Sequence, residues 1–387
     1  MRLTVVFALF FIPCLFSRAQ NNLYDFVNLG GYQVGFMDTL VLDGNYNYNG
    51  YDYKGQKPYF VQIWHPTKMK KNDYLTVKEF FTFQQNIALK GVQEQLTRQY
   101  RTLFIRDYLT ENLLSGETNH YSKYTFEDVL DSIGSIETRS VFDATIGNNN
   151  YPVIIYYNGS QGHPFENFAM AEYFASRGYL FIAASFELPF EQTPFGLLPY
   201  DRFITDEEEK SLKAITEFVK SLTESSQIFF VGHSMGAQMG LRTFGRDSTI
   251  KGMVSLETSI EFTTDIEKIK TLWPEVYQNI MVEKVNYPFP ILFCAATGAA
   301  KPFNFLENVQ APHITYASTT TEFEHNAYLS CFYLRYFLGQ AFQQSDVAIL
   351  EARLQLYVKH LELMYSFIDG ILNHAHKTKT ASILIQK

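Results

Sequence analysis

The sequence predicts an α/β protein in which a mostly parallel central sheet is flanked by helices. From residue 151 onward, short apolar patterns typical of buried strands alternate with amphipathic patterns typical of helices, beginning at 152–157, 165–177 and 179–184. A later strand pattern runs into a glycine-bracketed serine and then directly into a helical pattern. Such alternation builds a parallel sheet with helices on both faces. The 387 residues would suffice for one large domain or two ordinary ones, and we expect one.

The first twenty residues are typical of a secretory signal peptide. Arg2 precedes an apolar run over residues 3–16, and Ser17-Arg18-Ala19 then supplies the small-residue pattern of a cleavage site. The apolar run is too short to span a bilayer. Cys14 raises the alternative of a lipoprotein anchor, which the bulky residues before it disfavour. We therefore expect a secreted or periplasmic protein whose mature chain is one domain over residues 21–387.

The composition narrows the classes of partner. The chain has a formal net charge of −8 at pH 7, and an acidic protein is not expected to bind nucleic acid or an anionic membrane. Beyond the signal peptide it contains Cys294 and Cys331. These two could form one disulfide, although buried free thiols are the simpler interpretation. No group of Cys and His residues has metal-ligand spacing, so we expect no metal and no other cofactor.

The part of the chain before residue 151 is less regular. Short strand pieces are predicted at 32–36 and 39–42, a loop rich in Asn, Tyr and Gly at 43–56, and a clear strand at 59–64. Residues 69–132 then carry apolar side chains at helical spacing among Lys, Glu, Gln and Arg, which predicts a helical insertion. The insertion is either a packed flank of the domain or a lid over the active site, and the sequence favours neither.

The second half of the chain continues the alternation. Thr205 and Glu208 form a predicted capping box for the helix that precedes the serine motif. Beyond the motif the sequence predicts three more strands and two long helices, with strands at 250–256, 289–295 and 313–317 and helices at 325–338 and about 346–375.

The glycine-bracketed serine belongs to a Gly-x-Ser-x-Gly pentapeptide, Gly232-His233-Ser234-Met235-Gly236. A serine hydroxyl that is raised clear of a sheet must sit on a sharp, strained turn, where side chains two residues away on either side would collide. Glycine at both positions removes those side chains. Because the pentapeptide lies between a strand and a helix, as its geometry requires, we predict that Ser234 is a nucleophile and not an ordinary turn serine.

A nucleophilic serine needs an imidazole to take its proton and a carboxylate to fix the imidazole tautomer. With a serine on this kind of turn, both partners follow it in the chain, on loops after later strands. His325 lies in the polar loop 319–326 after the last predicted strand, so we predict that it is the general base. The other downstream histidines start a strand or lie on or beyond the terminal helix, namely His313, His360, His374 and His376.

The acid is sought at the carboxyl ends of the strands that follow the serine. The loop after strand 289–295, at 297–301, contains no carboxylate. Strand 250–256, in contrast, ends directly in Glu257. A carboxylate at the end of a buried strand is costly to hold without a partner, so Glu257 is the predicted acid. Glu261 and Asp265 are the reserve candidates.

An oxyanion hole requires two backbone N–H groups near the nucleophile. Met235, directly after the serine, supplies the first. The second is expected from the loop 158–164, where two glycines allow a backbone amide to turn toward the substrate. Ser160 is the predicted donor, with Gln161 as the second choice.

Taken together, these residues resemble the α/β-hydrolase superfamily, and within it the branch of platelet-activating factor acetylhydrolase and dienelactone-hydrolase-like esterases. Residues 61–66, Val-Gln-Ile-Trp-His-Pro, match the Trp-aromatic-Pro-like strand end of that branch. Glu257 falls where the branch places its acid, after the strand next to the nucleophile strand, and residues 324–326, Glu-His-Asn, resemble its histidine loop. The resemblance covers about residues 31–337, and the serine motif is its most specific part.

Two positions depart from the pattern of that branch. Its acid is usually Asp, where this chain has Glu257, and its oxyanion loop usually begins with His-Gly, where this chain has Asn158-Gly159. The first change is chemically mild because Glu serves in other triads. The second affects the identity of the oxyanion donor.

The expected function is hydrolysis of a carboxylic ester through an acyl-enzyme, without a cofactor. A peptidase or an acyltransferase would use the same residues, and a catalytically inactive hydrolase fold that serves as a binding protein is the alternative from another class. The substrate is expected to be a small molecule or a lipid or sugar ester. The aromatic loop 186–203 is expected near the pocket mouth, with candidate lining residues Phe186, Phe190, Phe195 and Tyr200.

Overall fold

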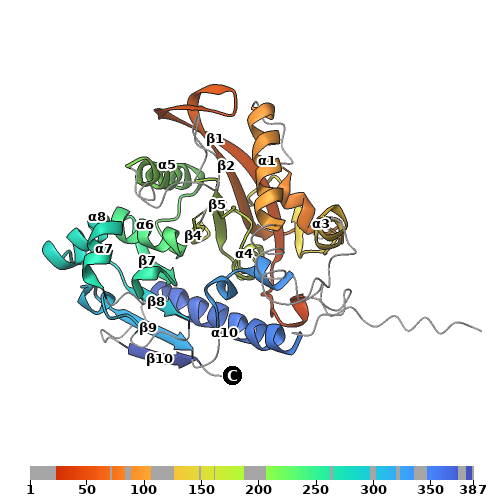
Figure 1. Ribbon diagram of the computed structural model, residues 1–387. Coiled ribbons are helices and arrows are strands. Elements are labelled where there is room, and N and C mark those ends of the chain that lie inside the picture. The colour runs from red at the N-terminus through yellow and green to blue at the C-terminus, as the bar shows by residue number, and fades with distance from the viewer. Residues whose placement is uncertain are drawn as a thin grey trace, which may run out of the picture.

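In the computed structural model, one mixed sheet forms the centre of the molecule and helices cover both of its faces (Figure 1). The structure describes residues 23–69, 72–82, 89–105, 126–147, 150–160, 162–186, 206–261, 265–296, 302–319, 323–334, 347–373 and 381–385. The predicted signal peptide therefore lies outside the described residues, as do His374 and His376 and the capping residue Thr205.

Within the described residues the sheet has ten strands in the order β10-β9-β8-β7-β6-β4-β5-β2-β1-β3. The strands are β1 (Gln33–Gly50), β2 (Tyr53–Thr67), β3 (Ser140–Phe142), β4 (Val153–Tyr157), β5 (Leu180–Ala184), β6 (Ile228–His233), β7 (Ile250–Leu256), β8 (Ile291–Ala295), β9 (Ile314–Thr319) and β10 (Ala381–Ile385). All neighbours from β5 to β10 pair in parallel, as does β3 with β1, whereas β2 pairs antiparallel with both β1 and β5. The predicted fold class, a mostly parallel sheet flanked by helices, is confirmed.

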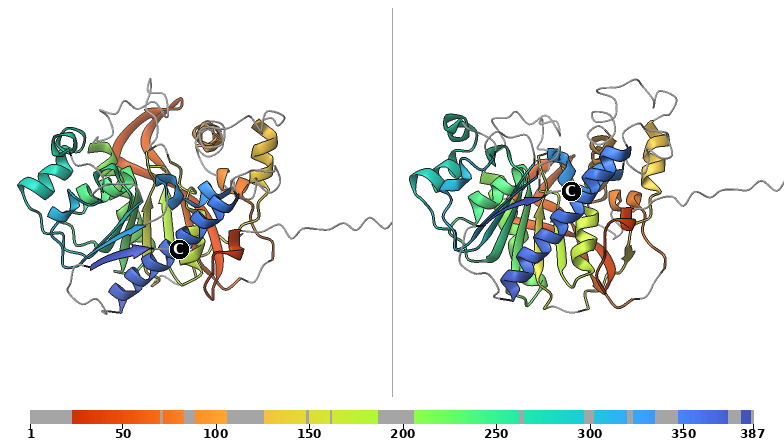
Figure 2. Two further views of the ribbon diagram at one scale, coloured as in Figure 1. Left: turned by 60° about the horizontal axis from the view of Figure 1, so that its bottom comes forward. Right: turned by 90° about the horizontal axis from the view of Figure 1, so that it is seen from below.

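Helices connect the parallel strands. The helical elements are η1 (Leu23–Asp25), η2 (Val77–Phe81), α1 (Lys90–Ile105), α3 (Phe126–Gly134), α4 (Phe168–Ala175), α5 (Asp206–Leu222), α6 (Met235–Thr243), η5 (Ser259–Glu261), α7 (Ile266–Leu272), α8 (Pro274–Tyr277), the π-helical η6 (Gln278–Val282), η7 (Leu306–Asn308), η8 (His325–Tyr328), η9 (Ser330–Tyr333) and α10 (Val347–Leu372). Helices α5 to α8 lie on one face of the sheet, and α4 and α10 lie on the other (Figures 1 and 2).

The two faces bury two separate hydrophobic clusters. Along β4, Val153, Ile155 and Tyr157 pack into the cluster beneath α5 and α6, while Ile154 and Tyr156 pack into the cluster beneath α4 and α10. This alternation follows from the two-residue period of a strand. A strand that is apolar on both faces must lie inside the sheet, which explains the continuous apolar runs of the central strands.

The strand pieces predicted at 32–36 and 39–42 lie, from residue 33 onward, within one longer strand, but the loop predicted at 43–56 is wrong. Strand β1 is continuous and forms a long hairpin with β2 across a turn at Tyr51 and Asp52, which have φ values of 53° and 57°. The Asn and Gly residues suggested a loop, but Tyr46 and Tyr48 are buried, and Asn45, Asn47 and Asn49 between and beside them are exposed. Alternate aromatic burial thus outweighs the low strand propensity of asparagine and glycine.

The predicted helix at 325–338 is wrong over its described part. Two short 3₁₀ turns, η8 and η9, replace it, and Leu329 between them is extended, with φ −105° and ψ 131°. The break allows Ser330 to donate a backbone hydrogen bond of 3.1 Å to Oδ1 of Asn167. Helix α4 is also shorter than the predicted 165–177, and the edge strands β3 and β10 were not predicted.

The described helices of the insertion pack on the face that carries α4 and α10. Buried side chains of η2, α1 and α3 belong to that hydrophobic cluster. The ring centroid of Phe165 lies 4.6 Å from that of Phe81 and 6.0 Å from that of Tyr100, and Tyr100 also contacts His163 at 5.9 Å. Helix α1 therefore lies beside the loop that follows β4, which is one of the loops of the candidate site.

Candidate active site

Ser234 lies on a strained turn between β6 and α6. Its φ of 51° and ψ of −118° are sterically unfavourable for a residue with a side chain. A Cβ atom on Gly232 would stand 2.4 Å from the backbone nitrogen of Ala237, and one on Gly236 would stand 2.2 Å from the carbonyl oxygen of Tyr157. Neither glycine position has room for a side chain. The turn leaves Ser234 partly exposed, whereas the residues on either side are buried.

Glu257 extends from the end of β7, the strand next to β6, into the same region. Its φ of 42° turns the chain sharply at that point. The carboxylate has both oxygens engaged: Oε1 lies 3.2 Å from Nδ1 of His325, and Oε2 accepts a hydrogen bond of 2.7 Å from the backbone nitrogen of Ala296. The backbone of Glu257 is tied to the nucleophile as well, because its carbonyl oxygen accepts a 3.1 Å hydrogen bond from the nitrogen of Ser234.

His325 is the first residue of η8 and follows the last residue of β9, Thr319, in the chain. Its side chain is 42% exposed, whereas that of Glu257 is 8% exposed. An ionised carboxylate accepts hydrogen bonds, so the contact with Glu257 places the hydrogen of the neutral ring on Nδ1 and leaves Nε2 as a base. Among the described residues, the hydroxyl of Ser234 makes no hydrogen bond. Contacts between nucleophile and base are often long in the free enzyme and shorten when substrate binds.

The reserve acids lie elsewhere. Glu261 is buried and accepts hydrogen bonds from the hydroxyl of Ser255 and the backbone of Thr258. Burial, more than the nearby charge of Glu257, raises the pKa of Glu261 well above its usual range. Asp265 caps the amino end of α7. The structure therefore brings Glu257, and neither reserve, to the predicted base.

The loop after β4 forms a tight turn beside the nucleophile. The backbone nitrogen of Gly162 donates to the carbonyl oxygen of Gly159 at 2.9 Å, and the nitrogen of Gly159 donates to Oε1 of buried Glu166 at 3.3 Å. A Cβ atom on Gly159 would stand 2.9 Å from Nδ1 of His233 and 3.3 Å from the Cβ of Ser234. Glycine is therefore required where the loop passes the nucleophile.

The two predicted oxyanion donors flank this contact. Met235 is the first residue of α6, where a helical N–H has no intrahelical acceptor. Ser160 follows Gly159 in the turn and is half-buried. The N–H of Gly159 donates to Glu166, so the next amide along the loop, that of Ser160, stays the predicted second donor. The second choice, Gln161, lies outside the described residues.

Sequence reasoning missed His233, the variable residue of the serine motif. Its imidazole is buried, with 3% of the residue exposed, and its Nε2 lies 3.2 Å from the carbonyl oxygen of His325. Burial, assisted by the neighbouring His325, lowers the pKa of His233 well below its usual value. The contact joins residues 92 positions apart, so no local sequence pattern could have revealed it.

Helix α10 contacts the base loop, which we define as residues 323–326 around His325. Nη2 of Arg353 donates to Oε1 of Glu324 at 2.6 Å, and the ring of His360 stacks on Phe323 with centroids 4.7 Å apart. These contacts fix the two residues directly before His325. Burial lowers the pKa of His360 to about 4, so its ring is neutral where it stacks.

Several other predictions concern the surroundings of the site. Phe186 is buried and stacks on Tyr157 with centroids 3.9 Å apart, which is core packing. The candidate lining residues Phe190, Phe195 and Tyr200 lie outside the described residues. Cys294 and Cys331 are both buried and free. In the part of the chain that the structure describes, no cluster of His, Cys, Asp and Glu could hold a metal ion, and no helix is long and apolar enough to cross a membrane.

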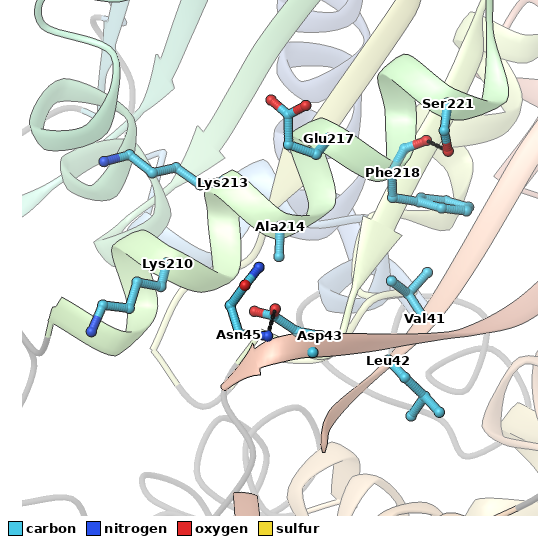
Figure 3. A pocket seen from close by; sticks show the side chains of 11 residues that line it. Val41, Leu42, Asp43, Asn45, Lys210, Lys213, Ala214, Glu217, Phe218 and Ser221 are labelled. Carbon is cyan, nitrogen blue, oxygen red and sulfur yellow. Dashed lines mark hydrogen bonds between the residues drawn. The ribbon is translucent and has the colours of Figure 1, made fainter. Parts of the chain in front are cut away.

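A groove of about 500 Å³ lies elsewhere, between the β1–β2 hairpin and α5 (Figure 3). Strand β1 contributes Val41, Leu42, Asp43, Gly44 and Asn45, and α5 contributes Lys210, Lys213, Ala214, Glu217, Phe218 and Ser221. None of the predicted catalytic residues lines it.

Comparison with known proteins supports the fold. No protein-family model and no curated protein matches the sequence. Among solved structures, a ferulic acid esterase from Streptomyces cinnamoneus matches over 87% of this chain and 89% of its own, with a TM-score of 0.53 and 13% sequence identity. The fold is therefore that of the α/β hydrolases.

Two other structures share less with this chain. A 2,6-dihydroxy-pseudo-oxynicotine hydrolase matches over 61% of this chain and 65% of its own, with a TM-score of 0.40 and 15% identity. An acylaminoacyl peptidase from Pyrococcus horikoshii has the same TM-score and identity, over 58% of this chain and 38% of its own.

Proposed function

We propose that this protein is a serine hydrolase that cleaves a carboxylic ester through an acyl-enzyme intermediate. The single observation that carries the proposal is the set of contacts around Ser234. A strained, partly exposed serine lies on a strand-to-helix turn, its backbone is bonded to Glu257, and the carboxylate of Glu257 contacts His325. Nucleophile, acid and base also occur in the chain order that this fold uses.

In the proposed reaction, the hydroxyl oxygen of Ser234 attacks the ester carbonyl carbon while its proton passes to Nε2 of His325. Glu257 holds the opposite ring nitrogen, Nδ1, and stabilises the imidazolium that forms. The proton then moves from His325 to the departing alcohol oxygen as the ester bond breaks, which leaves the acyl group on Ser234. A water molecule then gives a proton to Nε2 of His325 and attacks the acyl carbon. The bond between the acyl carbon and Ser234 breaks, the carboxylic acid leaves, and His325 returns the proton to the serine oxygen.

The negative charge that develops on the carbonyl oxygen needs preorganised donors. We assign this role to the backbone N–H groups of Met235 and Ser160, which flank the contact between Gly159 and the nucleophile turn. Loss of one such donor costs roughly 10²- to 10³-fold in kcat in comparable sites. No cofactor enters this scheme.

Within ester hydrolases, the position of Glu257 favours the branch of platelet-activating factor acetylhydrolase and dienelactone-hydrolase-like esterases. Its acid follows the strand beside the nucleophile strand, as β7 lies beside β6 here. The substrate would be a small-molecule, lipid or sugar ester, and export by the predicted signal peptide would place the reaction outside the cytoplasm. Mass spectrometry of the protein recovered from that compartment tests the export: a mature chain that begins close to residue 20 is expected.

The test is turnover of p-nitrophenyl esters of increasing acyl length, together with methyl ferulate, by the purified protein. Ser234→Ala should lower kcat by at least about 10⁴-fold and abolish labelling by a fluorophosphonate. Ser221→Ala, an exposed serine on α5, is the matched control and should retain full activity. Turnover of peptides alone would reassign the protein as a peptidase, and transfer to an added alcohol in preference to water as an acyltransferase.

Absence of both turnover and labelling would overturn the proposal. The favoured interpretation would then be a catalytically inactive hydrolase fold that acts as a binding protein.

A further inference from the structure

His233 lies where the three loops of the candidate site meet. Its ring centroid is 4.6 Å from that of His325, and its Nε2 is 3.2 Å from the carbonyl oxygen of the same residue. On its other side, Nδ1 lies 3.9 Å from Oε1 of Glu166, and a Cβ on Gly159 would stand 2.9 Å from this nitrogen. The residue is bonded covalently to Ser234. The buried ring of His233 therefore contacts the base loop around His325 and the oxyanion loop that follows β4. His233 also belongs to the nucleophile turn, residues 232–236.

The contact with the base loop fixes the tautomer of His233. A carbonyl oxygen can only accept a hydrogen bond, so Nε2 of His233 must carry the hydrogen and donate it to His325. Burial favours the neutral ring, since the charged form would lose its hydration. A neutral ring beside His325 also leaves that base free to take a proton without repulsion from a second cation.

Glu166 connects the same network to the oxyanion loop. Its Oε1 accepts hydrogen bonds from the hydroxyl of Tyr156 at 2.7 Å and from the nitrogen of Gly159 at 3.3 Å. Its carbonyl oxygen accepts a 3.0 Å hydrogen bond from the nitrogen of Cys331, in the segment that follows His325. Glu166 and His233 thus lie between the same two loops, and both are buried.

We propose that His233 is a positioning residue, which holds the backbone of His325 through an Nε2–H hydrogen bond and so sets the imidazole of the base against Ser234. This role rests on the proposed hydrolase function and deepens it. The side chain of His325 is 42% exposed, so the place of its ring depends on its contacts with Glu257 and His233 and on how its backbone is held. A displacement of about 1 Å between catalytic groups can cost roughly 10²-fold in rate.

The test compares three substitutions that differ in the donor they offer. In His233→Gln, the amide nitrogen takes approximately the place of Nε2 and keeps the donor. In His233→Asn the amide is too short to reach the carbonyl of His325, and in His233→Leu no donor remains. We expect kcat of the Leu and Asn variants to fall by at least tenfold with KM within twofold, and kcat of the Gln variant to stay within threefold of the wild type.

Thermal unfolding and circular dichroism separate positioning from folding. A purely structural role would lower the melting temperature in proportion to the loss of buried contacts and leave kcat of the folded protein unchanged. If the Leu variant does not fold, the comparison of Gln with Asn decides. Equal kcat values for Gln and Asn, or a folded Leu variant with wild-type kcat, would overturn the proposal.

A second measurement does not depend on ester turnover. The proton on Nδ1 of His325, which faces Glu257, should give a downfield ¹H NMR signal that is lost in the Glu257→Gln variant. We expect the Leu and Asn variants of His233 to shift or broaden this signal and the Gln variant to keep it. An unchanged signal in all three variants would contradict the positioning role. An inactive wild-type protein with the expected changes would count against the proposed hydrolase activity alone.

Discussion

Two regions of this molecule look like sites for different reasons. At the carboxyl ends of β6 and β7, a strained serine, a buried carboxylate and a histidine meet through backbone and side-chain hydrogen bonds. Between the β1–β2 hairpin and α5 lies a groove of about 500 Å³ whose charged α5 residues are exposed (Figure 3). The first region brings the chemically reactive groups together, whereas none of those groups lines the groove.

The difference lies in how each region holds its polar groups. Glu257 is 8% exposed and has a partner for each oxygen, which is costly to arrange and is maintained by surrounding structure. In the groove, Lys213 is paired with Glu209 one turn earlier on the same helix, an arrangement that contributes only a few tenths of a kcal/mol. Groups that are fixed from several distant elements indicate function better than a groove whose charged helix residues are exposed.

The largest effect is expected from Gly236→Ala, which disturbs the turn itself. The new Cβ would stand 2.2 Å from the carbonyl oxygen of Tyr157, a backbone atom that cannot move aside alone. We expect a loss of stability of about 2–4 kcal/mol and loss of ester turnover, measured by urea unfolding and p-nitrophenyl ester hydrolysis. Gly91→Ala is the control, because its Cβ meets nothing within 4 Å and helix α1 should gain roughly 0.5–1 kcal/mol. Normal stability of Gly236→Ala would show that the turn is not strained by close contact.

Glu257→Gln should reduce activity strongly while leaving the fold intact. The amide fills the same space but offers an N–H group to His325 or to Ala296, so the base loses the partner that fixes its tautomer. We expect kcat to fall by about 10²- to 10⁴-fold. The matched control is Asp265→Asn at the cap of α7, which should stay within twofold of the wild type. A small effect at Glu257 combined with a large one at Asp265 would reassign the acid.

The candidate site was visible in the sequence to the extent that its signals are local. The serine turn, the acid at the end of a strand and the histidine in a polar loop each show a short pattern, and the structure brings Ser234, Glu257 and His325 into one region. Their contacts depend on which strands are neighbours in the sheet. The prediction could use the nucleophile–acid–base order that is known for this fold. No comparable rule predicts where the helical insertion lies relative to the loop after β4.

Features set by contacts between distant segments were missed. The β1–β2 hairpin contains residues that favour loops, and only the burial of alternate tyrosines reveals it as sheet. The helical pattern at 325–338 is broken at Leu329 because Ser330 bonds to Asn167 from α4's amino end. His233 occupies the variable position of its motif, and the sequence did not indicate its role. Its partner is the backbone carbonyl of His325, and any residue type at that position would supply the same carbonyl.

Arg353→Ala should have an intermediate effect, because it weakens the base loop from the α10 side. The ion pair between Arg353 and Glu324 holds the residue before His325, but Glu324 is half exposed, and Phe323 keeps its stacking on His360. We expect kcat to fall by about 3- to 10-fold with a stability loss near 1 kcal/mol. Gln355→Ala, an exposed residue of the same helix, should change neither. A full loss of activity would mean that this ion pair, and not the remaining contacts, holds the loop.

The smallest effect is expected in the groove, and it tests whether the two regions are independent. Lys210 and Lys213 are exposed on α5, and neither contacts a residue of the candidate site within the described structure. Changing both to Ala should alter kcat and KM for p-nitrophenyl esters by less than twofold and stability by less than about 0.5 kcal/mol. Helix α5 packs against α6, which begins directly after Ser234, so the two regions are connected through packed helices. A change in kcat above twofold, with stability unaltered, would show that the groove communicates with the turn at Ser234 through the contact between α5 and α6, and the two regions would then not be independent.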